Sequence, residues 1–213
     1  MPGKHVHFSE DVSFPPTPSP TFSSNSLPSS YGPLTPPPFN SNQYLPANGV
    51  PMIHPTLAPA TPMPYLLFDV TLPAENVKPS PNARLSQGII FEAATSPPLP
   101  SILVVHPQIP RWPIIITPSE GKYVRVCDVL AGIYKSLRTS AGEADFQALP
   151  ASAQAEVTAA FKRRFQRMPD PASMKLENKK GLKWVDFLGS AVRFVGLSKA
   201  AEGPNVWQLH LST

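Results

Sequence analysis

Runs of apolar residues predict short β-strands in the second part of the chain. Residues 65–72 and 102–106 are rich in aromatic and β-branched side chains, and each run ends at a proline. Residues 88–92 predict a shorter strand or a turn. Residues 112–117 and 123–126 flank the turn sequence Pro-Ser-Glu-Gly, which predicts that these two runs form a β-hairpin.

The apolar period then changes from two residues to 3.6, which indicates helices. Residues 126–137 place valine, leucine and isoleucine on one helical face, and residues 151–168 are rich in alanine and end at Pro169. Residues 184–188 predict a short helix, whereas the polar residues 175–183 predict a loop.

The last two strands complete the prediction of the fold class. Residues 193–197 and 206–211 are separated by a Gly-Pro-Asn turn and predict a C-terminal hairpin. Strand pairs at each end with helices between them favour an α+β fold, in which two main helices pack on an antiparallel sheet of short strands. We expect Trp207 and Ile133 to lie in one core, because neither the last strand nor the first helix could bury its apolar face alone.

Composition separates the first 64 residues from the rest. They hold 16 of the 30 prolines, and residues 12–68 contain no charged side chain. Proline fixes its own φ, lacks a backbone donor and pushes the preceding residue out of the helical region, so this segment favours extended chain. We therefore predict a disordered Pro/Ser/Asn-rich tail over residues 1–64 and a single α+β domain over residues 65–213, a length that suits one core.

Charge and cysteine content exclude several classes of protein. From Tyr65 onward the chain has 17 basic and 12 acidic residues, so the predicted domain is basic. The single cysteine, Cys127, excludes a disulfide scaffold and a cysteine-rich zinc site, and it favours an intracellular location, cytoplasmic or nuclear. No run approaches the roughly 20 apolar residues that cross a bilayer, so no membrane partner is expected.

A short motif in the tail predicts docking on another protein. Lys4, Val6 and Phe8 are spaced two apart and precede acidic residues. In extended chain such positions point to the same side, so Val6 and Phe8 could enter adjacent pockets while the backbone pairs with a sheet edge. The motif resembles the one by which regulators bind the type-1 protein phosphatase catalytic subunit. Two alternatives to docking on a partner are a mobile N-terminus that binds nothing and a strand that docks on the chain's own domain.

The tail also contains candidate phosphorylation sites. Thr17, Ser19, Thr35 and Thr61 each precede a proline, as proline-directed kinases require. Each phosphate would add about −1.5 to −2 charge to a segment that has almost none. The same dipeptides arise by composition in a Pro-rich chain, so the pattern permits regulation without demonstrating it.

Candidate catalytic residues are few. An enzyme is the alternative function, with a site assembled from Cys127, His106, His210 and Asp128. A helix N-terminus can lower the pKa of a thiol, but an unpaired cysteine is more often a small buried apolar residue. No cluster has the composition of a metal site, and the glycines are scattered singly, so we predict no metal, no phosphate loop and no cofactor.

One basic stretch suggests a third function. Residues 162–199 contain ten basic and three acidic residues, a local charge of +7, with Trp184 among them. Such a stretch could bind nucleic acid weakly. A solvated charged helix face is the default explanation, and the stretch lacks an evident set of stacking aromatics.

Several segments together resemble a domain of unknown function that is widespread in mushroom-forming fungi. They are residues 67–70, 97–107, 112–114, 121–130 with Ile133 and Tyr134, 194–197 and 207–211. The resemblance covers roughly residues 65–213 and implies a domain behind a low-complexity N-terminus, with no established activity, cofactor or catalytic residue. The favoured function is therefore a non-catalytic protein-interaction domain that carries a phosphorylatable tail.

Overall fold

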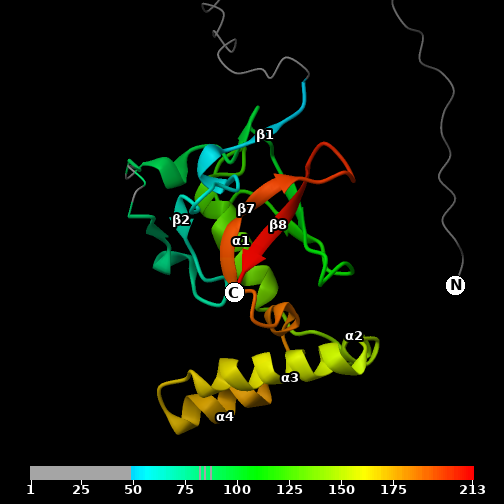
Figure 1. The fold of residues 1–213 in the computed structure, drawn as a ribbon. Coiled ribbons are helices and arrows are strands. Elements are labelled where there is room, and N and C mark those ends of the chain that lie inside the picture. Colours follow the sequence, from blue (N-terminus) through cyan, green and yellow to red (C-terminus); the bar gives the residue numbers. More distant parts are fainter. Residues whose placement is uncertain (1–48, 82, 84, 87) are drawn as a thin grey trace, which may run out of the picture. The chain divides into compact units, whose positions relative to one another are not determined.

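The centre of the fold is a four-stranded sheet. The computed structural model describes residues 49–81, 83, 85, 86 and 88–213. The strands lie in the order β6-β5-β8-β7, as Figure 1 shows in part. Their bounds are Ile102–Val105 for β5, Ile114–Ile116 for β6, Arg193–Lys199 for β7 and Val206–Ser212 for β8. With the helices below, this arrangement confirms the α+β fold class.

The sheet joins two antiparallel pairs through one parallel pair. β5 and β6 are antiparallel, and so are β7 and β8, which confirms the C-terminal hairpin. β5 and β8 run parallel, with Val104 opposite Trp207. The sequence contains no local signal for this pairing, because 100 residues of chain lie between the two strands.

The hairpin predicted for residues 112–117 and 123–126 is wrong. β6 pairs with β5, and residues 123–125 form no strand of the sheet. The backbone N–H of Val124 instead donates to the carbonyl of Leu99, and Arg125 forms an isolated bridge with Ala93. These two partners therefore lie 25 and 32 residues before the segment in the chain.

Short elements precede the sheet and cover part of it. They are β1 (Met52–Ile53), η2 (Pro55–Leu57), β2 (Leu66–Leu67), η3 (Ala74–Asn76), β3 (Lys78–Pro79), η4 (Ile89–Phe91) and β4 (Thr95–Ser96). β1 pairs with β4, and β2 pairs with β3. The strand predicted over residues 65–72 is thus only two residues long, and residues 88–92 form a single 3-10 turn.

The structured part extends beyond the predicted boundary at Tyr65. Leu57 of η2 is completely buried and belongs to the hydrophobic core. Gly196 of β7 lies so close to the same segment that a Cβ there would stand 2.4 Å from the nitrogen of Pro59. Residues 52–59 therefore pack on the sheet, and a division of the chain at residue 65 would remove part of the core.

The helices confirm three predictions and overturn a fourth. α1 (Val126–Leu137) and α3 (Ala151–Gln166) lie where the apolar period places them, and η5 (Trp184–Leu188) is the expected short helix. α4 (Pro171–Lys179) replaces the predicted polar loop, and α2 (Glu143–Gln147) is a further short helix. α4 has little apolar pattern because its one fully buried side chain is a carboxylate, Glu177, and its start is marked by Asp170, which accepts from the N–H of Ser173.

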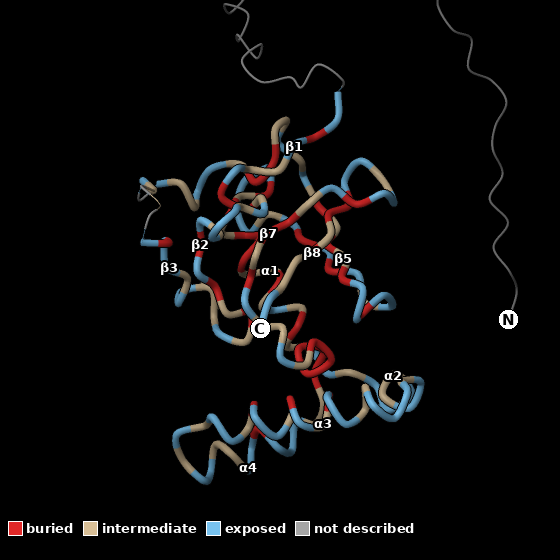
Figure 2. The backbone as a smooth tube through the Cα atoms, viewed as in Figure 1, coloured by how far each residue is buried: buried red, intermediate tan, exposed pale blue. Residues whose placement is uncertain are grey.

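α1 and β8 meet in one core, as expected. Ile133 is fully buried and Trp207 is 2% exposed, and both belong to the same cluster. Figure 2 shows the buried positions gathered on the sheet, on α1 and on η5. α3 differs from the prediction, because it packs on η5 and α4 rather than on the sheet. Within the described residues, no helix combines the length and the apolar character needed to cross a membrane.

Candidate functional site

A pocket lined by four arginines lies between α3, η5 with the residues that follow it, and residues 71–72. Its volume is about 410 Å³, and its arginines are Arg138, Arg163, Arg164 and Arg167. Asp186 of η5 is the one carboxylate among the lining residues. Leu72, Met168 and Val192 add apolar wall, and Thr71 and Ser190 add hydroxyls. We call this site the arginine pocket.

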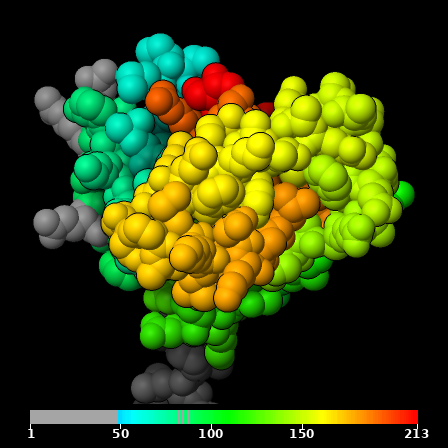
Figure 3. Space-filling view, turned by 90° about the horizontal axis from the view of Figure 1, so that it is seen from below, coloured from blue at the N-terminus to red at the C-terminus, as the bar shows by residue number. Residues whose placement is uncertain are grey.

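The local sequence explains how the arginines converge. Arg163 and Arg167 are four residues apart at the end of α3, so they lie on one face of the helix. Arg164 points to the buried side, where it packs against η5. Arg138 directly follows the last residue of α1 and comes from a separate part of the chain. Figure 3, which looks from below, shows α3 and α4 side by side on this face.

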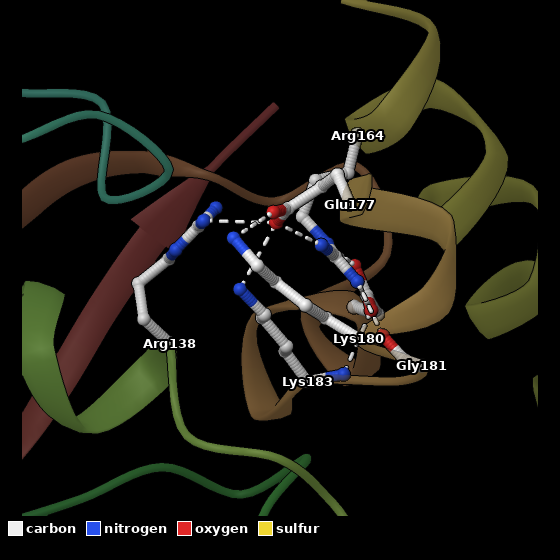
Figure 4. A network of polar contacts seen from close by, with 7 residues as sticks. Arg138, Arg164, Glu177, Lys180, Gly181 and Lys183 are labelled. Carbon is white, nitrogen blue, oxygen red and sulfur yellow. Dashed lines mark hydrogen bonds and ion pairs between the residues drawn. The ribbon is translucent and has the colours of Figure 1, made fainter. Parts of the chain in front are cut away.

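Behind the pocket lies a buried network of charges centred on Glu177. Figure 4 shows the side chains of Arg138, Lys180 and Lys183 converging on this carboxylate. The donor-to-oxygen distances are 2.8 Å from Arg138, 2.5 Å from Arg164, and 2.9 Å from each lysine. Glu177 is only 3% exposed, so its four cationic partners replace the water that it has lost.

Arg164 links this carboxylate to a second one. Its Nε and Nη2 atoms donate to the two oxygens of Asp186 at 2.8 and 2.9 Å, a bidentate contact. Nη2 also donates to the carbonyl of Gly181 at 2.8 Å. Asp186 further accepts from the backbone N–H of Lys183 at the start of η5. Arg164 is therefore held in one orientation by partners from α4, from the turn that follows it and from η5.

The charges of this region keep Glu177 ionised. Burial by itself would raise the pKa of Glu177, but hydrogen bonds from Lys180 and Lys183 and the charge of Arg138 lower it to about 2. Burial likewise opposes the charge of Arg164, whereas bonds to Asp186 and Glu177 raise the pKa of this guanidinium. Four cations thus face two carboxylates, which leaves the network with a net charge of +2.

The outer arginines are the ones within reach of a ligand. Arg163 and Arg167 are exposed. Arg163 donates to the carbonyl of Gly189 at 3.1 Å, and Arg167 donates to the hydroxyl of Thr71 at 3.4 Å. A guanidinium has five N–H donors, so one such bond leaves further donors for an anion. The pocket therefore combines two anchored arginines at its base with two accessible ones at its rim.

The structure gives Cys127 and the two histidines different charged surroundings. Cys127 lies in the first turn of α1, and burial raises the pKa of its thiol, as does the charge of Asp128. His106 follows β5, and burial lowers its pKa, as does the charge of nearby His210 on β8. The Nε2 atom of His210 is 2.6 Å from the hydroxyl of Ser198. The two histidines are thus neighbours, while the charged groups that act on Cys127 are Asp128 and Arg125.

Asp128 has a structural role in this arrangement. Its carboxylate accepts from the backbone N–H of Arg125 at 2.9 Å and from the hydroxyl of Ser119 at 2.5 Å. It therefore caps the start of α1, where the residue before the helix, Arg125, has no side-chain oxygen that could do so. Among the described residues, no group of three or more His, Cys, Asp or Glu side chains is placed to hold a metal ion.

Most of the predicted tail sites lie outside the described residues. These are Lys4, Val6 and Phe8 of the docking motif, and Thr17, Ser19 and Thr35 of the phosphorylation set. Thr61 is described and exposed. Ser80, which also precedes a proline, is only 4% exposed, so a kinase could not reach its hydroxyl in the folded domain.

Sequence reasoning found the basic stretch but not the site. It placed Lys162, Arg163 and Arg167 on a solvated helix face and Arg164 on the apolar stripe of the same helix, without a partner for its charge. Arg164 is buried in ion pairs, and so is Lys183, which was predicted to lie in a loop. Sequence reasoning also missed Arg138, which lies outside the basic stretch. The only local pattern that could have indicated the network was weak. Glu177 lies three residues before Lys180, which is the spacing of an ion pair on one face of a helix.

Comparison with known proteins gives a family and nothing further. A search of curated proteins found no match to the chain, and a search of solved structures found none. Residues 66–205 match a protein family described as "Family of unknown function (DUF6699)". This range includes the arginine pocket and most of the sheet, and it confirms that the resemblance was to a domain of unknown function. Since the match spans more than half of the sequence, the chain belongs to this family.

Proposed function

We propose that this protein is a non-catalytic binding module that takes an anionic group of a partner protein into the arginine pocket. The observation that supports the proposal most directly is the gathering of Arg138, Arg163, Arg164 and Arg167 around one cavity of about 410 Å³. That volume lies within the range of ligand sites, roughly 300–1,000 Å³. Arginine is the residue best suited to bind carboxylates and phosphates through paired N–H donors.

The buried network supports binding rather than stability alone. A buried ion pair contributes little net stability, because the loss of water offsets much of the attraction. Glu177 and Asp186 instead hold Arg138 and Arg164 in fixed orientations beneath the cavity. A guanidinium that is already ordered loses less conformational entropy when a ligand binds. The net positive charge of the network also favours an anion over a cation.

The alternatives have weaker support. A thiol activated for catalysis needs a lowered pKa, whereas burial raises the pKa of Cys127. Weak nucleic-acid binding would use the same arginines. However, the side chains that line the cavity include no aromatic ring on which a base could stack.

Several finer aspects of the function belong to the same proposal. The protein is fungal, acts inside the cell in the cytoplasm or the nucleus, and uses its N-terminal part for regulation. Lys4, Val6 and Phe8 form a separate docking motif for type-1 protein phosphatase. Each of these statements rests on the amino-acid sequence alone.

Thermal unfolding in inorganic phosphate tests the pocket. A ligand at 100 times its dissociation constant stabilises the folded state by about 2.7 kcal/mol. For a chain of this length we expect a rise in Tm of about 5 to 10 °C. The variant Arg163→Ala/Arg167→Ala should lose this rise, because it removes the two accessible guanidinium groups.

A matched variant separates binding from general salt effects. Phosphate also stabilises proteins by exclusion from their surface, so the measured quantity is the difference between variants at equal ionic strength. Lys162→Ala/Lys175→Ala removes two exposed positive charges from α3 and α4 outside the cavity and should keep the full rise. If all three proteins respond equally to phosphate, the proposed function is wrong.

A further inference from the structure

We propose that a phosphorylated Ser-Pro or Thr-Pro segment from the chain's own N-terminal part, at Thr17, Ser19 or Thr35, binds in the arginine pocket. The inference rests on the proposed function and names the ligand and the regulation of the same site. A phosphorylated tail would fill the cavity, so a partner's anionic group could enter only when the tail is unmodified.

The chemistry of the cavity fits a phosphorylated residue followed by proline. A phosphate monoester carries about −1.5 to −2 charge and three strong acceptor oxygens, which suits several guanidinium groups at once. The wall beside the arginines contains Leu72, Met168 and Val192. These side chains offer apolar contact to the threonine methyl group and to a proline ring. A ligand that has both an anion and an apolar neighbour uses the whole site, whereas a free phosphate uses only its charged part.

The N-terminal part of the chain has the complementary property. Residues 12–68 carry no charged side chain, so without modification they have no ionic attraction to the pocket. Phosphorylation would place the only charge of this segment at the modified residue. Thr17 and Ser19 are two residues apart, so this pair could present two phosphates to Arg163 and Arg167 together. Binding to the pocket would thus depend almost entirely on the phosphate.

The segment is long enough to reach the site. Thr35 lies fourteen residues and Thr17 thirty-two residues before Gly49, the first described residue. At about 3.3 Å per residue, fourteen residues span up to about 46 Å. A domain of this size has a radius of gyration of about 15 Å. A sphere with that radius of gyration has a radius of about 20 Å, so the path around it to the opposite side is about 60 Å. Thirty-two residues span up to about 106 Å, so Thr17 could reach any part of the domain surface, whereas Thr35 could reach only the nearer part.

The modification is an ordinary phosphoryl transfer. A proline-directed kinase would move the γ-phosphoryl group of ATP to the side-chain hydroxyl. The new bond joins phosphorus to the Oγ atom of Ser or the Oγ1 atom of Thr, and ADP and a proton leave. A hydroxyl residue directly before proline, as at Thr17, Ser19 and Thr35, is the sequence that such kinases need.

The first experiment measures peptide binding to the unphosphorylated full-length protein by fluorescence anisotropy. A labelled peptide of residues 13–24 with phosphates on Thr17 and Ser19 should bind at least tenfold more tightly than the unmodified peptide. Arg163→Ala/Arg167→Ala should weaken this binding at least tenfold. Lys162→Ala/Lys175→Ala should change it by less than twofold, which controls for the loss of surface charge.

The possible failures separate the inference from the proposed function. If inorganic phosphate binds through Arg163 and Arg167 but the phosphopeptide binds no better than the unmodified peptide, the ligand assignment is wrong and the anion site stands. If neither ligand responds to the arginine variant, both are wrong. If a single-stranded oligonucleotide displaces the labelled peptide more effectively than the unlabelled phosphopeptide does, nucleic acid is the better ligand and the assignment fails.

The second experiment tests whether the chain binds its own segment. Full-length protein treated with a proline-directed kinase and ATP should bind the labelled phosphopeptide at least tenfold more weakly, because its own segment occupies the cavity. The variant Thr17→Ala/Ser19→Ala/Thr35→Ala, treated in the same way, should keep its affinity. If kinase treatment leaves the affinity of the unmutated protein unchanged, the pocket does not bind its own tail and the proposal is refuted.

Discussion

Replacement of Glu177 by glutamine should destabilise the protein in a pH-dependent manner. The substitution preserves the shape of the side chain but removes the negative charge that faces Arg138, Arg164 and Lys183. Arg164 would keep its pair with Asp186, whereas Glu177 is the only carboxylate among the described residues that pairs with the side chains of Arg138 and Lys183. Removal of one member of a buried ion pair typically costs about 3–5 kcal/mol, because it leaves charge that is neither hydrated nor neutralised.

The pKa of Glu177 gives an independent magnitude. The pKa falls from 4.5 to about 2 on folding, and each unit corresponds to about 1.4 kcal/mol. Relative to its protonated form, the ionised carboxylate therefore stabilises the folded state by about 3 kcal/mol. Since the folded pKa is lowered, this contribution is complete above about pH 5 and is lost as the pH falls toward 2. It should be about 1 kcal/mol at pH 3.

Urea unfolding of both proteins between pH 7 and pH 3 measures this contribution. At pH 7 the free energy of unfolding of Glu177→Gln should be lower by about 3 kcal/mol, and its Tm should be lower by about 6 to 12 °C. The difference between the two proteins should shrink as the pH falls, because protonation of Glu177 makes the unmutated protein resemble the variant. Glu202→Gln, at an exposed turn, should stay within about 0.5 kcal/mol of the unmutated protein.

Two results would contradict the reasoning. A difference below about 1 kcal/mol at pH 7 would mean that the cations find water or other partners in the variant. A difference that stays constant down to pH 3 would mean that Glu177 does not titrate in the way its surroundings indicate. Either result would mean that Glu177 does not hold Arg138 and Arg164 in place, and these two arginines would no longer support an anion site.

Three further substitutions test the packing of the fold by thermal or chemical unfolding. Leu57→Ala should cost about 2–5 kcal/mol, because this side chain is completely buried; a cost near zero would place residues 52–59 outside the cooperative core. Trp207→Ala should cost about 3–5 kcal/mol, and a shift in Tm of less than about 2 °C would contradict its place in the core. Gly196→Ala should be destabilising, because its Cβ would collide with the backbone of Pro59; an unchanged Tm would show that this contact can relax without cost.

Local patterns were sufficient for several elements. α1 spans Val126–Leu137, as its apolar stripe predicts. The buried face of an amphipathic helix can be predicted from the sequence because its apolar residues recur every three to four positions. The C-terminal hairpin was equally accessible, since β7 and β8 are close in the chain and joined by a turn sequence. The burial of Trp207 followed from the alternation of β8. In each case the residues that determine the element are near one another in the chain.

The same reasoning failed where a polar group is buried. α4 has the composition of a loop, since its buried side chain is Glu177 and not an apolar residue. A pattern of apolar positions cannot detect a helix that contributes a carboxylate to the interior. The error at residues 123–126 has a related cause, because a turn sequence suggests a hairpin but does not reveal that β5 is the better partner of β6.

The sequence by itself determined the α+β class, the main helices and the apolar core, while the tertiary structure decided where the charges lie. Arg138 meets Glu177 across 39 residues of chain, and Arg164 meets Asp186 across 22. The parallel pairing of β5 with β8 and the packing of Leu57 under β7 depend on still longer separations. A local pattern of apolar residues predicts which face of a helix or strand is buried. The residue that pairs with a buried charge can come from a distant part of the chain, so that pairing is decided only when the elements pack together.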